Sequence, residues 1–564
     1  MTELKKLTLR CLLENSAEKY SDRPALSFID SRPISYAELY EEVIQLIRFL
    51  QSQGIAPGDK VAILSENQPN WGIAYFAVTL MGAVAVPILP DFHTSEILHI
   101  IRHSECKAIF VSRRLLEKIE EARFLKSLKL ILIDNFEPIT LQGSKTILKE
   151  VLNRGEREIS KLKQSARKLG GKLHSEPEED DLAVIIYTSG TTGHSKGVML
   201  THKNLVSNAT SALSFQKVTP GDRLVSILPL SHTYECTIGF LIPILQGACI
   251  YYLNKPPTPR LLLEAMQKVK PTIMLSVPLV IEKIYKTRVL PELTRNGLLR
   301  RLYKISPIRK RLHRIAGKKL LKSFGGELVF FGIGGALLAP EVEHFLREAR
   351  FPYAIGYGLT ETSPLVAGSG KHNTRFRSTG PPIEGVEVKI HDPNPETGEG
   401  EIWVRGPNVM KGYYKDPERT ASVLTEDGWF KTGDLGYLDK DNYLYIKGRL
   451  KNMIVGPSGE NIYPEEIEAI LNEFDYVMES LVYMHENKLT ARVHLNYEEL
   501  DELFGKENLT ETEERARIQQ LLEQIRTEVN SRVSSYSRLH RIIEQTEPFE
   551  KTPTQKTKRY LYVN

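Results

Sequence analysis

A short apolar strand, residues 183–187, runs directly into a loop rich in glycine and hydroxyl side chains. The loop reads Thr188-Ser-Gly-Thr-Thr-Gly-His-Ser-Lys-Gly197 and contains one lysine, Lys196. Glycines allow backbone N–H groups to close around an anion, hydroxyls donate further hydrogen bonds, and the lysine adds a positive charge. The pattern predicts a phosphate-binding loop in an α/β protein, with a plain surface loop as the alternative interpretation.

The loop differs from the two commonest phosphate-binding motifs. A Walker A loop needs Gly directly before the lysine and Ser or Thr after it, whereas Ser195 precedes Lys196 and Gly197 follows it. The later segment 332–336 is not a dinucleotide fingerprint, because Leu337 occupies the third glycine position. The sequence therefore indicates another class of nucleotide-binding protein.

The segments around this loop alternate helix and strand signals, which favours an α/β fold with largely parallel sheets. Residues 71–90 carry no charge and are long enough to span a bilayer. Gly82, Pro87 and Pro90 interrupt them, so we predict a buried helix over 71–81 and a buried strand over 84–88. Residues 237–253 repeat this design. Residues 386–447 change to short alternating strands and predict a small β-rich subdomain.

Composition excludes several classes of protein. The 564 residues are 41% apolar and 26% charged, which excludes a disordered or fibrous chain. The net charge of +5 is too balanced for a protein that binds nucleic acid over its whole surface. Four distant cysteines without a Cys-x-x-Cys pair indicate neither a disulfide framework nor a zinc site. With no apolar leader segment at the N-terminus, we expect a cytoplasmic protein.

One segment, residues 286–322, is strongly basic. It contains 13 Lys or Arg and a single acid, Glu292. Apolar side chains are interleaved with the charges: Leu298, Leu299, Leu302, Leu312 and Ile315. Two interpretations stay open: a solvated helical face, or a surface attracted to anionic lipid or to an acidic partner protein. By contrast, residues 152–181 are interpreted as a solvated linker.

Five segments in sequence order resemble the signature motifs of the adenylate-forming, or AMP-binding, superfamily, which includes acyl-CoA synthetases and luciferases. They are residues 187–202, 332–336, 356–362, 432–436 and 448–454. The resemblance covers nearly the whole chain. It implies a large N-terminal domain, residues 1–450, of stacked α/β subdomains with a small β-rich subdomain. A small, mobile α+β C-terminal domain, residues 451–564, would carry the catalytic lysine.

The resemblance implies a site for ATP and Mg²⁺. Tyr357 would offer its ring to adenine, Asp434 would bind both ribose hydroxyls, and Arg449 would add a contact to ribose or phosphate. Read from the residues alone, Tyr357 could instead be a core tyrosine and Asp434 a turn aspartate. Thr188 and Glu361 would hold the metal, since hard oxygen ligands suit Mg²⁺. The implied ATP-binding residues are Thr188, Ser189, Gly190, Thr191, Thr192, Gly193, Lys196, Gly334, Gly335, Ala336, Gly356, Tyr357, Gly358, Thr360, Asp434 and Arg449.

Residues 228–235, Leu-Pro-Leu-Ser-His-Thr-Tyr-Glu, look most like the acyl-side segment of long-chain fatty acyl-CoA synthetases. The resemblance places His232, Thr233 and Val277 in the acyl pocket. A metal site on His232 and Glu235 lacks a third ligand. A nucleophile pair of Ser231 and His232 is disfavoured, because adjacent side chains rarely point at each other.

The C-terminal segment departs slightly from the family pattern. Thr552, Lys556 and Arg559 match it, whereas Gln555 replaces a glycine. Lys556 would be the catalytic lysine, with Lys551 and Lys558 as neighbouring rivals. Lys451 takes the hinge position, followed by Asn452 where the family often has Asp. Gly459 would line the coenzyme A channel.

The resemblance implies a two-step reaction in which ATP activates a fatty acid to an acyl-adenylate and coenzyme A then displaces AMP. Lys196, His232 and Lys556 are the implied catalytic residues. Three alternatives stay open: transfer to an acyl carrier protein, a coenzyme A ligase for aromatic acids, and a binding protein without catalysis. The basic segment 286–322 would contact a carrier protein or an anionic membrane, which adds a peripheral position on the inner membrane face to the expected localisation. No nucleic-acid partner is expected.

Overall fold

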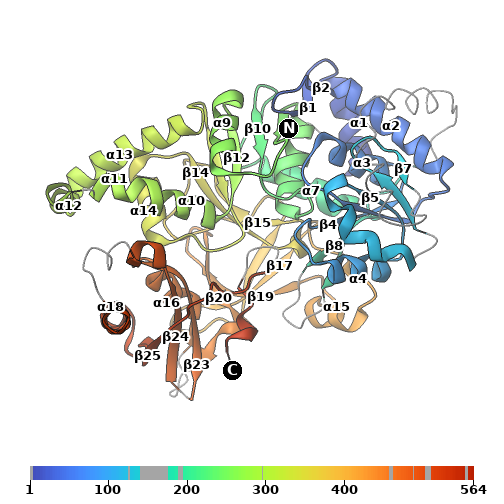
Figure 1. The fold of residues 1–564 in the computed structure, drawn as a ribbon. Coiled ribbons are helices and arrows are strands. Elements are labelled where there is room, and N and C mark those ends of the chain that lie inside the picture. The colour runs from blue at the N-terminus through green and yellow to red at the C-terminus, as the bar shows by residue number, and fades with distance from the viewer. Residues whose placement is uncertain are drawn as a thin grey trace.

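The computed structural model describes residues 4–124, 128–139, 176–188, 195–294, 296–455, 461–474, 476–486, 488–501, 510–552 and 557–563 (Figure 1). The chain forms two large sheets whose strands are interleaved in sequence, a smaller antiparallel sheet and a C-terminal α+β part. The fold class predicted from the sequence is confirmed. The linker 152–181 lies mostly outside the described residues.

The first large sheet has eight strands, and its centre is parallel. In spatial order they are β15 (Leu365–Gly368), β14 (Tyr353–Gly358), β13 (Phe330–Ile333), β12 (Ile273–Ser276), β10 (Arg223–Ser226), β11 (Cys249–Tyr252), β1 (Pro24–Phe28) and β2 (Ile34–Ser35). Only the edge strands β15 and β2 run antiparallel to their neighbours. The carboxyl ends of β10, β12, β13 and β14 consequently lie on one side.

The second large sheet also has eight strands with a parallel centre. In spatial order they are β18 (Gly412–Tyr413), β9 (Lys196–Thr201), β8 (Leu182–Thr188), β4 (Val84–Ile88), β3 (Lys60–Leu64), β5 (Cys106–Val111), β6 (Lys129–Leu132) and β7 (Pro138–Ile139). Its strands are short buried apolar runs, as expected for a sheet covered on both faces. The phosphate loop leaves this sheet at the end of β8.

Helices fill the space between the two sheets and cover them. Helix α3 (Pro69–Leu80) is buried from Trp71 to Leu80 and packs into one core with residues of both sheets. A helix that is apolar all round is stable only in such a position. The other helices of the large domain are α1 (Leu9–Lys19), α2 (Tyr36–Ser52), α4 (Thr94–Ser104), α7 (His202–Ala212), α8 (Ile242–Gln246), α9 (Pro259–Val269), α10 (Pro278–Ile284), α11 (Leu290–Thr294), α12 (Gly297–Tyr303), α13 (Ser306–Ser323), α14 (Pro340–Ala349) and α15 (Pro417–Val423).

The predicted helix and strand at 71–88 are confirmed as α3 and β4, with Gly82 at a positive φ of 79° between them. The repeat at 237–253 ends as expected in Gly247 and β11. It begins, however, with a π-helical segment, η3 (Tyr234–Leu241), before α8. Within the described residues, no helix combines the length and the apolar character needed to cross a bilayer.

The predicted β-rich subdomain is confirmed as a four-stranded antiparallel sheet. Its strands are β16 (Glu387–His391), β17 (Gly400–Arg405), β19 (Phe430–Leu438) and β20 (Leu444–Arg449). It has a small apolar core of its own around Ile402, Val404 and Leu444. The sheet ends at Arg449, directly before the predicted hinge.

The C-terminal part has a separate hydrophobic core, and every member of that core follows Lys451. Its elements are β21 (Ile454–Val455), β22 (Asn461–Ile462), α16 (Pro464–Leu471), β23 (Val477–His485), β24 (Lys488–Leu495), α18 (Glu511–Arg532) and β25 (Arg541–Glu544). Helix α16 contacts β20, and Tyr463 donates a hydrogen bond of 2.9 Å to Glu399 in the large domain. An independent core joined by few contacts is typical of a domain.

Candidate active site

Four parallel strands of the first sheet end side by side. Predicted site residues lie after three of these strands and near the end of the fourth. His232 lies after β10, Val277 after β12, Gly334 after β13, and Tyr357 lies near the end of β14. Ligands of open α/β sheets bind at the carboxyl ends of the strands. The fold thus brings acyl-side and adenine-side residues to one edge.

The lysine of the phosphate loop meets the predicted metal carboxylate. Lys196 Nζ donates to Glu361 Oε1 at 2.6 Å and to the Tyr413 hydroxyl at 2.7 Å, and that hydroxyl donates to the same Oε1 at 2.9 Å. Burial opposes the charged form of Glu361, but the Lys196 charge and the hydrogen bonds outweigh it, so the pKa of Glu361 lies below its ordinary value. At neutral pH the cluster is an ion pair. The sequence motifs did not point to Tyr413, which lies in β18.

Thr188 ends β8 opposite Lys196 in the β8–β9 register. Its hydroxyl oxygen is buried and has no hydrogen-bond partner in the part of the chain that the structure describes. A buried unpartnered oxygen needs an explanation such as a missing ion or ligand. The other phosphate-loop candidates fall outside the described residues: Ser189, Gly190, Thr191, Thr192 and Gly193.

A second charged cluster joins the adenine and ribose motifs. Asp434 in β19 faces Arg449 in β20, whose Nε lies 2.7 Å from Oδ1, and the Tyr357 hydroxyl donates to Oδ2 at 2.6 Å. Burial, followed by the Asp434 charge, raises the pKa of Tyr357 well above its ordinary value, so this hydroxyl stays protonated. Asp434 is only 4% exposed and lies within a strand. The alternative of a turn aspartate is therefore wrong, because Asp434 lies within β19.

Glycines let the adenine-side loops approach their neighbours. A Cβ at Gly358 would lie 1.9 Å from the carbonyl oxygen of Pro364, and a Cβ at Gly334 would lie 3.2 Å from the ring of Tyr234. These close approaches within the protein require positions 358 and 334 to lack side chains. The remaining predicted residues of this side are Gly335 and Ala336 after β13, Gly356 in β14, and Thr360 at the start of η5 (Thr360–Thr362).

The predicted acyl-side residues adjoin the adenine-side loop. His232 is partly exposed, and its Nδ1 accepts a hydrogen bond from the Tyr234 N–H at 3.2 Å. Thr233 is fully buried, and its hydroxyl has no partner among the described residues. Val277 precedes α10, and a Cβ at Gly335 would lie 3.8 Å from it. The two predicted subsites therefore share a wall.

A polar network that sequence analysis missed holds the acyl-side segment in place. Asn67, in the loop after β3 of the second sheet, donates to Ser226 Oγ at 2.9 Å and to the Leu228 carbonyl at 2.6 Å, and accepts from the Leu230 N–H at 2.9 Å. Ser226 Oγ donates to Glu235 at 2.6 Å. Burial raises the pKa of Glu235 to about 8. Asn67 precedes Ser226 by 159 residues, and only the three-dimensional fold brings them together.

The predicted catalytic lysine, Lys556, lies outside the described residues, but its rivals do not. Lys551 forms an ion pair with Glu479, and Lys558 lies 3.5 Å from Glu550. Both pairs are internal to the C-terminal part. The rivals thus have structural partners of their own.

Three further residues that the sequence motifs indicate lie in or next to the C-terminal part. Arg559 is paired with Glu468 at 2.8 Å and donates to the Val482 carbonyl at 2.7 Å, which anchors the C-terminal segment. Lys451 lies in the turn η6 (Leu450–Asn452), between the β-rich subdomain and the C-terminal part. Gly459 lies outside the described residues.

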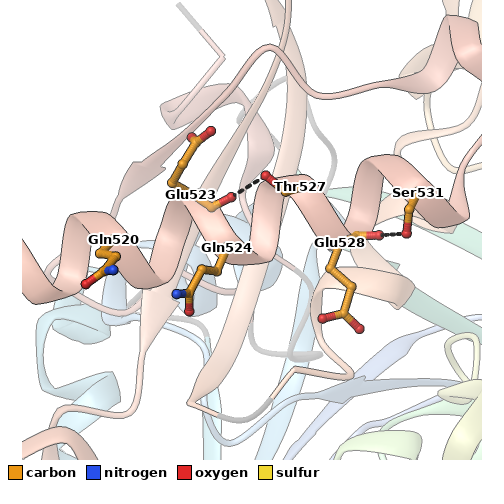
Figure 2. Close-up of a pocket in the computed structure, with 6 residues that line it drawn as sticks. All are labelled: Gln520, Glu523, Gln524, Thr527, Glu528 and Ser531. Atoms are coloured by element: carbon orange, nitrogen blue, oxygen red, sulfur yellow. Dashed lines mark hydrogen bonds between the residues drawn. The ribbon is translucent and has the colours of Figure 1, made fainter.

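Figure 2 shows a surface hollow along α18, away from the predicted motifs in sequence. Side chains of this one helix line it: Gln520, Glu523, Gln524, Thr527, Glu528 and Ser531. Thr527 and Ser531 donate back to carbonyls of their own helix, as drawn. No cation lines the hollow and its two hydroxyls are bonded to carbonyls of their own helix, so we assign it no catalytic role.

Two known proteins are similar to this chain over most of its length. A Bacillus subtilis long-chain-fatty-acid–CoA ligase is 31% identical over 500 residues, covering 84% of this chain and 82% of the relative. A chloroplastic long-chain-fatty-acid acyl-carrier-protein ligase of Arabidopsis thaliana is 30% identical, covering 80% of this chain and 71% of the relative. The similarity thus extends over most of each protein.

Solved structures share the fold. ATP-bound MatB from Rhodopseudomonas palustris superposes with a TM-score of 0.74 at 24% identity, covering 98% of this chain and 97% of that one. The AMP complex of O-succinylbenzoate coenzyme A synthetase from Bacillus subtilis gives 0.73 at 22% identity, with 98% of each chain covered. The family model described as "AMP-binding enzyme" matches residues 13–414. The chain therefore belongs to the AMP-binding enzyme family.

Proposed function

We propose that this protein is an AMP-forming acid–thiol ligase that activates a long-chain fatty acid and transfers it to coenzyme A. The observation that carries the proposal is the contact of the phosphate-loop Lys196 with Glu361, residues 165 positions apart in sequence. It brings the phosphate-loop motif and the motif of the predicted metal carboxylate to one place, as a ligand that spans both would require. The fatty-acid specificity draws support from the ligases at 30–31% identity.

In the first step a carboxylate oxygen of the fatty acid attacks the α-phosphorus of ATP, and the bond to the β-phosphate oxygen breaks. The carboxylate is already ionised at neutral pH, so no general base is needed. The protein has to offset the repulsion between a carboxylate and a polyphosphate. Lys196 would do this at the β- and γ-phosphates and Lys556 at the α-phosphate, as the charge shifts toward pyrophosphate.

Thr188 and Glu361 fit a magnesium ion. The buried oxygen of Thr188, which has no partner among the described residues, and the ionised Glu361 are hard oxygen ligands, both within reach of Lys196. When bound there, Mg²⁺ would neutralise phosphate charge. Phosphate oxygens and water would complete its coordination.

The Asp434 cluster would hold the nucleoside. Arg449 faces Oδ1 of Asp434 and the Tyr357 hydroxyl donates to Oδ2, so the carboxylate has a fixed orientation in which it would accept hydrogen bonds from the ribose hydroxyls. Tyr357, fixed by its hydroxyl, would present its ring to adenine between Gly356 and Gly358. The residues 334–336 would close the other side of the base.

In the second step the thiol sulfur attacks the acyl carbon, AMP leaves, and the thiol proton is released. We propose that the C-terminal domain, residues 451–564, rotates at Lys451 between the steps. That rotation would withdraw Lys556 and bring Gly459 to the thiol channel. The separate core of this domain makes such a movement feasible without unfolding.

An acyl carrier protein is the second candidate acceptor, because a carrier-protein ligase covers 80% of this chain at 30% identity. The first step is common to both reactions. The difference lies only in which thiol reaches the acyl-adenylate. His232 and Thr233 would face the same fatty acid in either case.

The test is ATP–pyrophosphate exchange across a panel of fatty and aromatic acids, followed by thioester detection with coenzyme A or carrier protein. We expect exchange with long-chain fatty acids and a coenzyme A thioester. Exchange only with aromatic acids would contradict the fatty-acid assignment. If a thioester formed only on the carrier protein, the carrier protein and not coenzyme A would be the acceptor.

A further inference from the structure

The helices α11, α12 and α13 project at one edge of the large domain, away from α2 and α3 (Figure 1). Seven of their basic side chains are exposed and form no ion pair within the described part of the chain. These residues, which we call the basic edge, are Arg300, Arg301, Lys310, Arg311, Arg314, Lys318 and Lys322. The last four recur at spacings of three or four residues, so they follow one face of α13.

The inner face of α13 is tied down. Arg309 makes two hydrogen bonds to the nearly buried Glu348 of α14, at 2.9 and 3.1 Å. His313 is 2% exposed, and its Nε2 lies 2.8 Å from the Tyr303 hydroxyl of α12. Leu312 packs against the core. Arg309 and Leu312 are therefore part of the fold, which corrects the expectation that the whole segment 286–322 faces a partner.

Apolar side chains accompany the exposed cations. Leu298 is 69% exposed, Ile305 48% and Ile315 50%. Ile315 follows Arg314 directly and lies one turn before Lys318. Single exposed apolar residues are common. Cations alternating with exposed Leu and Ile on a projecting helical edge are instead typical of a surface that lies in the interfacial layer of a membrane.

The basic edge is continuous in sequence with the predicted acyl side. The chain passes from Val277, beside Gly335, through α10 and the π-helical turn η4 (Tyr285–Val289) to α11. Leu279, in the first turn of α10, is 46% exposed. One segment thus links the acyl pocket to the exposed helices.

We propose that the basic edge binds the anionic phospholipid surface of a membrane, with Leu298 and Ile315 in contact with the acyl-chain boundary. A carrier protein would satisfy the cations with its acids but would leave these apolar side chains without a purpose. A bilayer satisfies both. The proposal rests on the proposed function only in making the membrane the source of the fatty acid, and lipid binding is measured without turnover.

The test is co-sedimentation of the full chain with phosphatidylcholine vesicles, with and without phosphatidylglycerol. The patch variant is Arg311→Ser, Arg314→Ser and Lys318→Ser together. The matched control changes three exposed lysines elsewhere, Lys217, Lys255 and Lys440, to Ser. Circular dichroism and ATP–pyrophosphate exchange with a water-soluble short acid verify that each variant is folded.

Wild type should bind only the anionic vesicles, and binding should weaken as the Debye length falls from about 30 Å at 0.01 M salt to about 3 Å at 1 M. Each cation near an anionic leaflet contributes about a fivefold factor in partition coefficient, so the patch variant should lose at least tenfold. The control should lose less than about threefold. Leu298→Ser with Ile315→Ser should also weaken binding.

Several results would overturn the proposal. The first is absence of wild-type binding to anionic vesicles at low salt, and the second is an equal loss in the patch and control variants. Binding of an acidic carrier protein through the same three residues, without vesicle binding, would assign the surface to that partner. If the variant Leu298→Ser with Ile315→Ser bound vesicles as wild type does, the proposed contact of these two side chains with the acyl-chain boundary would be wrong. Failure of the proposed function is distinct, since it appears as lost exchange with vesicle binding intact.

Discussion

The nucleotide side and the basic edge both depend on cations but arrange them in opposite ways. At the nucleotide side, Lys196 and Arg449 each contact a nearly buried carboxylate, Glu361 and Asp434. On the basic edge, described cations such as Arg314 face solvent without an acid. A cation paired with a carboxylate has a fixed position, and the pair produces little electric field at a distance. An unpaired cation attracts anions over about a Debye length but does not hold them in a defined position.

This difference separates two tasks. Phosphoryl chemistry needs charges placed within tenths of an ångström of the reacting atoms, which a preorganised ion pair supplies. Binding to a fluid surface needs only net charge of one sign. The number of Lys and Arg in a segment therefore says less about its task than the number that have partners.

The largest expected effect is at Lys556, the cation assigned to the reacting phosphate. Lys556→Ala should reduce acyl-adenylate formation on the order of 1,000-fold, because a charge that stabilises the transition state is lost. Conversion of supplied acyl-adenylate and coenzyme A to thioester should stay within about threefold. Pyrophosphate exchange and thioester formation, measured separately, check this.

Lys558→Ala is the control, since Lys558 lies 3.5 Å from Glu550 and belongs to the C-terminal part. It should leave both steps nearly unchanged. Equal losses in both steps for Lys556→Ala would contradict the two-position mechanism.

The next effect compares two low-exposure carboxylates that each have a cation partner, Glu361 and Glu348. Glu361→Gln should reduce exchange about 100-fold, because Lys196 and the metal lose their shared partner. Glu348→Gln should leave exchange nearly unchanged but lower the free energy of unfolding by about 1–3 kcal/mol, because Arg309 loses a buried partner. Exchange rates and urea denaturation distinguish the two. If Glu348→Gln also abolished exchange, the assignment of Glu348 to stability and of Glu361 to the reaction would be wrong.

A third test concerns Glu235, a buried acid that has no cation partner among the described residues. Burial raises its pKa to about 8, so the folded state binds more protons than the unfolded state from about pH 5 to 8. The free energy of unfolding should then fall with rising pH, by up to about 1.4 kcal/mol per pH unit from this group. Glu235→Gln should remove that slope, whereas Glu18→Gln, at an exposed position, should not. If the free energy of unfolding changed equally with pH in wild type and in Glu235→Gln, the prediction would be contradicted.

The smallest expected effect is at Asn67, which has a neutral side chain. Asn67→Ala should raise KM for the fatty acid and lower exchange by about tenfold in total, since the His232 segment loses three hydrogen bonds. Asn70→Ala is the matched control, because Asn70 donates to two backbone carbonyls, those of Ile133 and Asp134, away from the acyl side. KM for ATP should stay unchanged in both variants. An equal effect of the two variants would mean that Asn67 acts on stability alone.

Much of the fold could be predicted because its central strands are short buried apolar runs. Strands β4 and β8 lie where the apolar runs predicted them. The π-helical segment Tyr234–Leu241 could not be predicted, because an apolar run has the same composition in an α- or a π-helix. Its Glu235 accepts a hydrogen bond from Ser226 of β10, a contact that no local pattern in the sequence reveals.

The candidate site could be predicted only where its residues lie in contiguous motifs. Lys196, Glu361 and Asp434 do, and the structure brings Lys196 and Glu361 together. Tyr413 and Asn67 carry no local signal, since their partners are far away in sequence. The charge count of 286–322 was correct, but it could not reveal that Arg309 points inward to Glu348, a residue of another helix.

The contact between Lys196 and Glu361 has a thermodynamic consequence. In the described state, the group assigned to the phosphates and the group assigned to the metal satisfy each other. A nucleotide that takes Lys196 leaves Glu361 buried without a cation, and a metal that takes Glu361 releases Lys196. Each ligand therefore raises the affinity for the other by the same factor, which is the reciprocity that linkage requires. Free ATP and free Mg²⁺ should bind weakly alone, and the complex of the two should bind cooperatively.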